Sequence, residues 1–370
     1  MKEEPRTERQ EEHAAAYLPV GGSPVRHSRW VRVALLCGLA AFAAIFFFAD
    51  VDELWAVLQR ANPWLLMLPV LCMLASYLTM ARSYQGISQA AGYPVPLVDM
   101  LKITVVANAV NYLVATGGLS GFAVRMFYFS RLGMSSQTAV LVSLAQTFLT
   151  NLMLLAFLLL GFAYVISTGA MQGSALLVTT VVLGLLVLAA VFAALLLFHA
   201  RLRRRALFRL AQAAHWVLHR LLPHRAPART HIWRYQFNLN RGIGFLLAQG
   251  RAMRGPVLYI ALDWLFTILI LYTAFVAVRY PIPITHVIVG FAVGIVLSFA
   301  SLIPGGLGVM EGSMAAVFAS MDVPFETAVV AVLIFRIAYY LLPLLLSLFF
   351  LHGMFVQGTT LRHEGGAPSG

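Results

Sequence analysis

The sequence predicts an all-α integral membrane protein, and three observations support this fold class. The chain of 370 residues is 61% hydrophobic and 11% charged, with a mean hydropathy of +0.84. Apolar runs such as residues 175–198 are longer than the roughly 20 residues that cross a bilayer as a helix. Between residues 201 and 254 there are twelve arginines and no aspartate or glutamate, which is typical of a cytoplasmic loop beside a membrane.

The strong positive charge is explained by the membrane. The formal net charge is +12 at pH 7, but the arginines lie beside hydrophobic runs, where they orient the spans and attract anionic headgroups. We therefore expect membrane lipids, and not nucleic acids, as partners. The two cysteines, Cys37 and Cys72, lie in apolar segments, which offers neither a disulfide framework nor a cysteine cluster for a metal. No metal or other cofactor is expected.

Six apolar runs have the length of full spans. They occupy residues 30–49, 63–81, 138–166, 175–199, 256–278 and 326–355. A rise of about 1.5 Å per residue makes each run long enough to cross. With the basic segment 200–255 in the cytoplasm, both termini lie inside, as an even number of spans requires. We expect this multi-pass arrangement in the inner (plasma) membrane.

The same patterns predict the domain organisation. Residues 30–356 form the transmembrane domain, and the polar segments 1–29 and 357–370 are expected to be disordered tails, the first of them cytoplasmic. Within the basic segment 200–255, apolar residues recur at helical spacing over residues 206–222. This stretch is predicted to be an amphipathic helix lying on the inner membrane surface.

Two further apolar segments, residues 98–131 and 283–324, are each interrupted by glycines. We expect these interruptions to act as gates, and their residues are Gly117, Gly118, Pro304, Gly305, Gly306 and Gly308. Irregular backbone is tolerated in hydrocarbon only where protein buries it or where it lines a wet cavity. Because the flanking stretches are short for full crossings, two re-entrant hairpins are predicted. Ordinary turns between helices remain the alternative.

The two broken segments belong to an internal repeat. Gly-Gly-Leu at residues 117–119 recurs at 305–307, and Thr-Ala-Val at 138–140 recurs at 327–329. In each half a span, a broken hairpin and a long span follow one another. Counted from a cytoplasmic N-terminus, the first hairpin opens from the inside and the second from the outside, so the repeat is inverted. Interrupted segments in corresponding positions of inverted halves indicate a transport site near the middle of the bilayer.

The ionisable residues of interest at membrane depth are Arg125, Asp263, Glu311 and Arg336. Each needs a partner or water there. Arg125 and Glu311 follow their glycine breaks at similar distances and are expected to pair across the two halves. Asp263 is the expected counter-charge of Arg336, which shares a helix face with Tyr340. These charges either hold helices together or bind a headgroup phosphate, which arginine matches with paired donors.

Two asparagines, Asn108 and Asn111, precede the first glycine break. An intramembrane amide either lines a polar cavity or forms a hydrogen bond across neighbouring helices. Both residues are candidates to line the same site, and the structural role remains the alternative.

The residues around the second break resemble a known family. Residues 304–311 read Pro-Gly-Gly-Leu-Gly-Val-Met-Glu, and Phe-Glu-Thr-Ala follows at 325–328. This pattern is similar to the transmembrane, flippase-like region of lysylphosphatidylglycerol synthases and of free-standing proteins like it, and the resemblance extends from residue 29 to residue 356. It implies movement of a lipid with a charged or sugar-phosphate headgroup between leaflets. Only a short tail follows residue 356, so aminoacylation is not expected.

Three functions remain open. The first is a lipid translocase in which Arg125, Glu311 and Arg336 contact the headgroup and the inverted halves rock about a central cavity. The second is a non-transporting scaffold that recruits enzymes of lipid, hopanoid or glycolipid synthesis through the basic segment. The third is a polyprenyl-phosphate-dependent glycosyltransferase. The acidic residues do not cluster as that chemistry requires, so we do not expect an enzyme.

Overall fold

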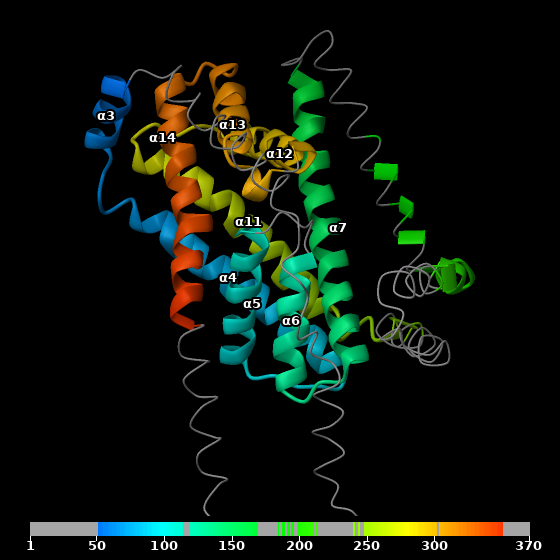
Figure 1. Cartoon of the computed structure of the whole chain (residues 1–370). Helices are drawn as coiled ribbons and strands as arrows, with labels where there is room; N and C mark the ends of the chain where they lie inside the picture. The colour runs from blue at the N-terminus through cyan, green and yellow to red at the C-terminus, as the bar shows by residue number, and fades with distance from the viewer. Residues whose placement is uncertain are drawn as a thin grey trace, which may run out of the picture.

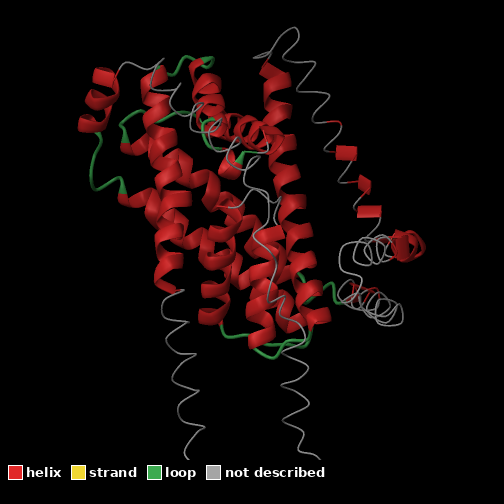
Figure 2. Cartoon of the chain, in the orientation of Figure 1, coloured by secondary structure: helices red, strands yellow, loops and turns green. Residues whose placement is uncertain are grey.

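The protein is built from helices (Figure 2). The computed structural model describes residues 51–113, 119–168, 251–301 and 303–350, together with scattered residues between 184 and 250. Within this part of the chain every regular element is helical. An all-α architecture is therefore confirmed for the described residues.

Several predicted segments fall wholly or largely outside the described residues. They are the tails 1–29 and 357–370, the spans 30–49 and 175–199, and the amphipathic helix 206–222. The predicted spans 63–81, 138–166 and 256–278, and the span 326–355 as far as residue 350, lie in the described part and are mostly helical.

Helices α4 (Met67–Ala90) and α11 (Arg254–Ala277) run antiparallel, side by side, through the middle of the molecule (Figure 1). They pack closely near Gly86, because a Cβ there would lie 2.8 Å from Cγ of Pro256. The span predicted to end at residue 81 continues to Ala90 as α4. Several polar residues beyond residue 81, namely Ser83, Tyr84 and Ser88, do not end the helix because they are buried against neighbouring helices and do not face lipid.

Three described helices are long and apolar enough, by length and composition, to cross a membrane. They are Ser136–Gly161, Arg254–Ala277 and Phe325–Phe350. Each coincides with a span predicted from the sequence. The first belongs to α7 (Ser136–Thr168), and the last begins as α14 (Phe325–Arg336) and continues through a π-helical turn at Ile337–Leu341.

Two helical hairpins pack beside these helices. The first consists of α5 (Leu97–Leu113) and α6 (Leu119–Arg131), and the second of α12 (Ile284–Ser301) and α13 (Val309–Ala319). In Figure 1 the first hairpin occupies the lower half of the molecule and the second the upper half, and they open toward opposite ends. Helix, broken hairpin and long helix thus follow in the same order in both halves of the chain.

Glycines allow the helices of each hairpin to approach closely. A Cβ at Gly290 of α12 would lie 2.4 Å from the ring of Phe318, and one at Gly294 would lie 2.5 Å from Cγ of Met314. Side chains of α13 therefore pack directly on the backbone of α12. In the first hairpin a Cβ at Gly121 of α6 would lie 2.7 Å from a carbonyl oxygen of α5. Small residues at such contacts are typical of helices that pack in membranes.

Candidate functional site

The second glycine break has a backbone that requires glycine. Gly305, Gly306 and Gly308 have φ angles of 60°, 61° and 77°, a region that side chains with a Cβ disfavour. At Gly306 the space is also closed, because a Cβ would lie 1.8 Å from Oγ of Ser298 on α12. The chain leaves the break at Val309, where α13 begins.

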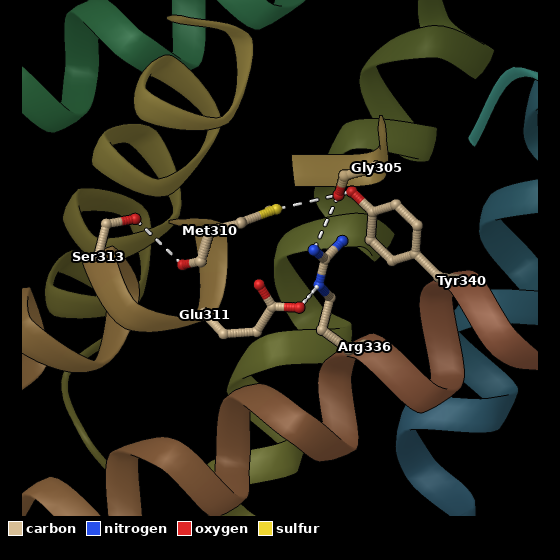
Figure 3. Close-up of polar contacts among 6 residues, drawn as sticks. All are labelled: Gly305, Met310, Glu311, Ser313, Arg336 and Tyr340. Atoms are coloured by element: carbon tan, nitrogen blue, oxygen red, sulfur yellow. Dashed lines mark hydrogen bonds and ion pairs between the residues drawn. The ribbon is translucent and has the colours of Figure 1, made fainter. Parts of the chain in front are cut away.

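Arg336 of α14 ties this break to the start of α13 (Figure 3). Its Nε donates to Oε1 of Glu311 over 2.6 Å, and its Nη2 donates to the carbonyl oxygen of Gly305 over 2.8 Å. Glu311 lies in the first turn of α13, where the helix dipole favours a negative charge. Both side chains are more than nine-tenths buried. A buried, hydrogen-bonded ion pair therefore joins the consecutive helices α13 and α14, and its arginine also binds the irregular backbone that precedes α13.

The ring of Tyr340 packs against one face of the Arg336 guanidinium. The Cζ atom of Arg336 lies 4.2 Å from the centroid of the Tyr340 ring, a cation–π contact. The Tyr340 hydroxyl reaches Sδ of Met310 over 3.6 Å (Figure 3). Arg336 is followed at once by the π-helical turn Ile337–Leu341, and π turns inside α-helices often mark functional sites. The predicted shared face of Arg336 and Tyr340 is confirmed.

The end of α5, just before the first glycine break, lies against the second break. A Cβ at Gly305 would lie 3.4 Å from the carbonyl oxygen of Tyr112. The ring of Tyr112 packs on Tyr340 with centroids 4.5 Å apart and on Tyr339 with centroids 6.1 Å apart. The two halves of the chain therefore meet at the second break. Gly117 and Gly118 lie outside the described residues.

The predicted pairing of Arg125 with Glu311 is wrong. Glu311 pairs with Arg336, because α13 packs on α14. Arg125 lies on α6, which packs on α5 and α7. Its guanidinium lies 5.5 Å from the ring centroid of Tyr84 on α4. The residue is 8% exposed, and its Nε is buried with no hydrogen-bond partner among the described residues.

The predicted pairing of Asp263 with Arg336 is also wrong. Asp263 faces α4, where Oγ of Ser76 donates to its Oδ1 over 2.5 Å. Oγ1 of Thr267 lies 3.4 Å from Oγ of Ser76 and donates to the carbonyl oxygen of Asp263 over 2.9 Å. All three side chains are buried. This small polar cluster joins α11 to α4 partway along the contact between the two helices.

The two asparagines make contacts between helices. Nδ2 of Asn108 donates to Sδ of Met80 on α4 over 3.1 Å, and Oδ1 of Asn111 accepts from Oγ of Ser120 on α6 at 3.5 Å. Both asparagines are half-buried. These contacts agree with the structural alternative, and they leave a role in lining the site as a prediction.

Sequence reasoning missed several polar residues because they are uncharged and lie within or beside apolar runs. They are Ser76, Tyr77, Ser83, Tyr84, Tyr112, Ser143, Gln146 and Thr267, all in the interior of the helical bundle. Their signal in the sequence is a hydroxyl or amide at membrane depth, where each such group needs a partner. Within the described residues no group of three or more His, Cys, Asp or Glu side chains is placed to hold a metal ion.

Comparison with known proteins gives one match over most of the chain and two over shorter segments. Residues 30–347 match the family model described as "Lysylphosphatidylglycerol synthase TM region". The chain is 33% identical over 85 residues to a "UPF0104 membrane protein" of Methanothermobacter thermautotrophicus, and this aligned segment is 23% of this chain and 24% of that protein. It is also 34% identical over 86 residues to a "Phosphatidylglycerol lysyltransferase" of Staphylococcus haemolyticus, and this aligned segment is 23% of this chain and 10% of that protein.

Proposed function

The chain belongs to the family of lysylphosphatidylglycerol synthase transmembrane regions, and we propose that it is a flippase-like lipid translocase. It moves a lipid with a charged or sugar-phosphate headgroup from one leaflet of the membrane to the other. The resemblance seen in the sequence is thereby confirmed at the level of the family. The matched segments span about a quarter and a tenth of the two curated relatives, so the activity is our proposal for this chain.

The proposed membrane arrangement has six full spans and two re-entrant hairpins related by an inverted repeat. Its support is the position of the hairpins α5–α6 and α12–α13, which open toward opposite ends of the molecule (Figure 1). Shorter apolar helices such as Ile284–Ser298 and Val309–Ala319 suit hairpins that enter and leave on one side. We place the protein in the inner membrane with the basic segment 200–255 and both termini in the cytoplasm.

One observation carries the translocase proposal. A buried arginine, Arg336, holds the carbonyl oxygen of Gly305 in the glycine break and the carboxylate of Glu311 at the same time. The break itself touches the end of α5 in the other half of the chain. Irregular backbone and buried charge are both costly in a membrane and are retained where they line a pathway.

In this proposal the glycine breaks are gates and the buried polar residues form the headgroup track. Gly117, Gly118, Pro304, Gly305, Gly306 and Gly308 absorb the backbone changes as the two halves rock. Arg125, Glu311, Arg336, Asp263, Asn108 and Asn111 line the track that the headgroup crosses. The acyl chains remain in the bilayer while the headgroup passes, so the protein alters the sidedness of the lipid and forms no new bond.

The proposal is tested with the purified full-length chain in vesicles that contain headgroup-labelled phosphatidylglycerol. An impermeant quencher reports the fraction of label in the outer leaflet, and chromatography of the extracted lipids reports their composition. A translocase exposes label from the inner leaflet and leaves the composition unchanged. A changed lipid composition identifies an enzyme such as a glycosyltransferase. If neither the leaflet exposure nor the composition changes across a panel of labelled lipids, the non-transporting scaffold is the function that remains.

A further inference from the structure

Arg125 is a buried cation with no counter-charge among the described residues. It forms no ion pair and no hydrogen bond with them, and its Nε is buried without a partner. Its described contact is the face of the Tyr84 ring, at 5.5 Å. Removing a guanidinium from water is strongly unfavourable unless an anion or several acceptors replace the water, and an aromatic face replaces only part of that hydration.

Two further donors on the neighbouring helix α7 are also buried and unpaired among the described residues. They are Nε2 of Gln146 and Oγ of Ser143. The two residues are three positions apart, so they share one face of α7. Oε1 of Gln146 accepts a hydrogen bond from Oγ of Ser83 on α4 over 2.9 Å, which leaves the amide nitrogen as the free end of this side chain. Hydroxyl, amide and guanidinium groups all donate hydrogen bonds.

The three donors lie toward the same end of the molecule. Ser83, which holds Gln146, is adjacent in α4 to Tyr84, which contacts Arg125. From a rise of about 1.5 Å per residue, Tyr84 and Arg125 lie about 9 Å from the ends of α4 and α6. Ser143 and Gln146 lie about 10 Å and about 15 Å from the start of α7 by the same measure. These three helix ends lie together at the lower end of Figure 1.

We propose that Arg125, Ser143 and Gln146 form an anion-binding site between α4, α6 and α7 that takes the phosphate of a phosphate ester. The inference rests on the proposed function, because it makes this site the first contact of a lipid headgroup. Arginine offers paired donors to phosphate oxygens, and the amide and hydroxyl groups satisfy the remaining oxygens. Arg336 differs from Arg125, because Nε and Nη2 of Arg336 already donate to Glu311 and to the carbonyl oxygen of Gly305, whereas Nε of Arg125 has no partner among the described residues.

Binding is measured with the full-length chain in detergent micelles, using phosphatidylglycerol as the probe and diacylglycerol as the matched lipid without phosphate. We expect phosphatidylglycerol to bind and diacylglycerol not to bind. The variant Arg125→Gln should weaken binding about ten- to a hundredfold, the loss typical of a charge-assisted hydrogen bond. The control is Arg131→Gln, which removes an exposed arginine of the same helix and should bind like the wild type. Equal binding by Arg125→Gln and the wild type overturns the site.

A second variant tests the site without removing the arginine. Gln146→Glu retains the acceptor for Ser83 and places a carboxylate in the proposed site. We expect this variant to fold, to unfold at a higher temperature than the wild type and to lose phosphatidylglycerol binding. If Gln146→Glu binds phosphatidylglycerol with the wild-type affinity, the proposal is overturned. This test holds even if Arg125→Gln fails to fold.

Soluble sn-glycerol 3-phosphate distinguishes the two sources of the same chemistry. Binding of phosphatidylglycerol with no competition from glycerol phosphate assigns the site to lipids, whereas equal competition assigns it to phosphate esters in general.

The experiments can contradict the anion-binding site and the proposed translocase function independently of each other. A wild type that binds phosphatidylglycerol through Arg125 but moves no lipid contradicts the translocase alone. A wild type that moves lipid while Arg125→Gln binds and moves it normally contradicts the site alone.

Discussion

Nε of Arg336 lies 2.6 Å from Oε1 of Glu311, and the same guanidinium holds the carbonyl oxygen of Gly305. One buried side chain thus binds both the irregular segment that precedes α13 and the first turn of α13. The contact links the last long helix to the second hairpin, and the Tyr112 backbone brings the first half of the chain to the same point. Changes at this junction are therefore expected to affect both stability and the movement of the hairpin.

Removing Glu311 alone should leave Arg336 buried without its counter-charge. We expect Glu311→Gln to lower the free energy of unfolding by about 3–5 kcal/mol, the usual cost of breaking a buried ion pair. Replacing both partners, by Glu311→Leu with Arg336→Met, should recover most of this loss because no buried charge remains. Denaturation in mixed micelles measures both variants. If the double variant is less stable than the single one, the pair is not coupled as described.

Gly306 should not tolerate a side chain. Its φ of 61° costs an L-residue about 1–2 kcal/mol, and a Cβ would also collide with Oγ of Ser298. Gly306→Ala should therefore lower the unfolding temperature, whereas Gly250→Ala, where a Cβ meets no atom within 4 Å, should leave it nearly unchanged. Equal melting curves for the two variants would show that the break does not have this backbone.

The contact of Gly294 with Met314 should behave as a coupled pair. A Cβ at Gly294 would lie 2.5 Å from Cγ of Met314, and overpacking of this kind typically costs about 1–3 kcal/mol. We expect Gly294→Ala to be destabilising in the wild type and much less so in a Met314→Ala background, where the space is open. A double-mutant cycle measures this coupling. Strict additivity would contradict the close packing of α12 on α13.

Ser76 should stabilise the packing of α4 on α11 by donating to Asp263. Ser76→Ala leaves a buried carboxyl oxygen without this donor, at an expected cost of about 1–3 kcal/mol. Ser130→Ala is the matched control, because the hydroxyl of Ser130 is exposed and donates to a carbonyl within its own helix. Denaturation midpoints compare the two serines. A smaller loss for Ser76→Ala than for Ser130→Ala would rule out a structural role for the contact.

The helices and breaks could be predicted from the sequence because each depends on local composition. Apolar length gave α7 and α11, and glycines marked the break whose φ angles require them. The end of α4 was missed because a run of polar residues looks the same whether it faces water or packs against another helix. Serine and tyrosine residues such as Ser83 extend α4 by packing inside the bundle.

The charge pairs could not be predicted from the internal repeat. The repeat shows which positions are equivalent in the two halves of the chain, but it does not show which residues lie next to each other in the fold. Arg125 and Glu311 have similar places after their breaks, but their hairpins lie toward opposite ends of the molecule (Figure 1). Glu311 is therefore closer to the helix that follows its own hairpin and pairs with Arg336. Asp263 has the charge to pair with Arg336, but its helix turns it toward Ser76 on α4.

The central claim is that lipid headgroups cross the membrane past Arg336, and its most direct test compares rates of lipid movement. The double variant Arg336→Gln with Glu311→Gln removes both charges together and is compared with the wild type and with Arg131→Gln in vesicles of phosphatidylglycerol. We predict that the folded double variant moves labelled lipid at least about tenfold more slowly, since a headgroup phosphate loses a charge-assisted hydrogen bond, while Arg131→Gln matches the wild type. Equal rates for all three proteins would contradict the account.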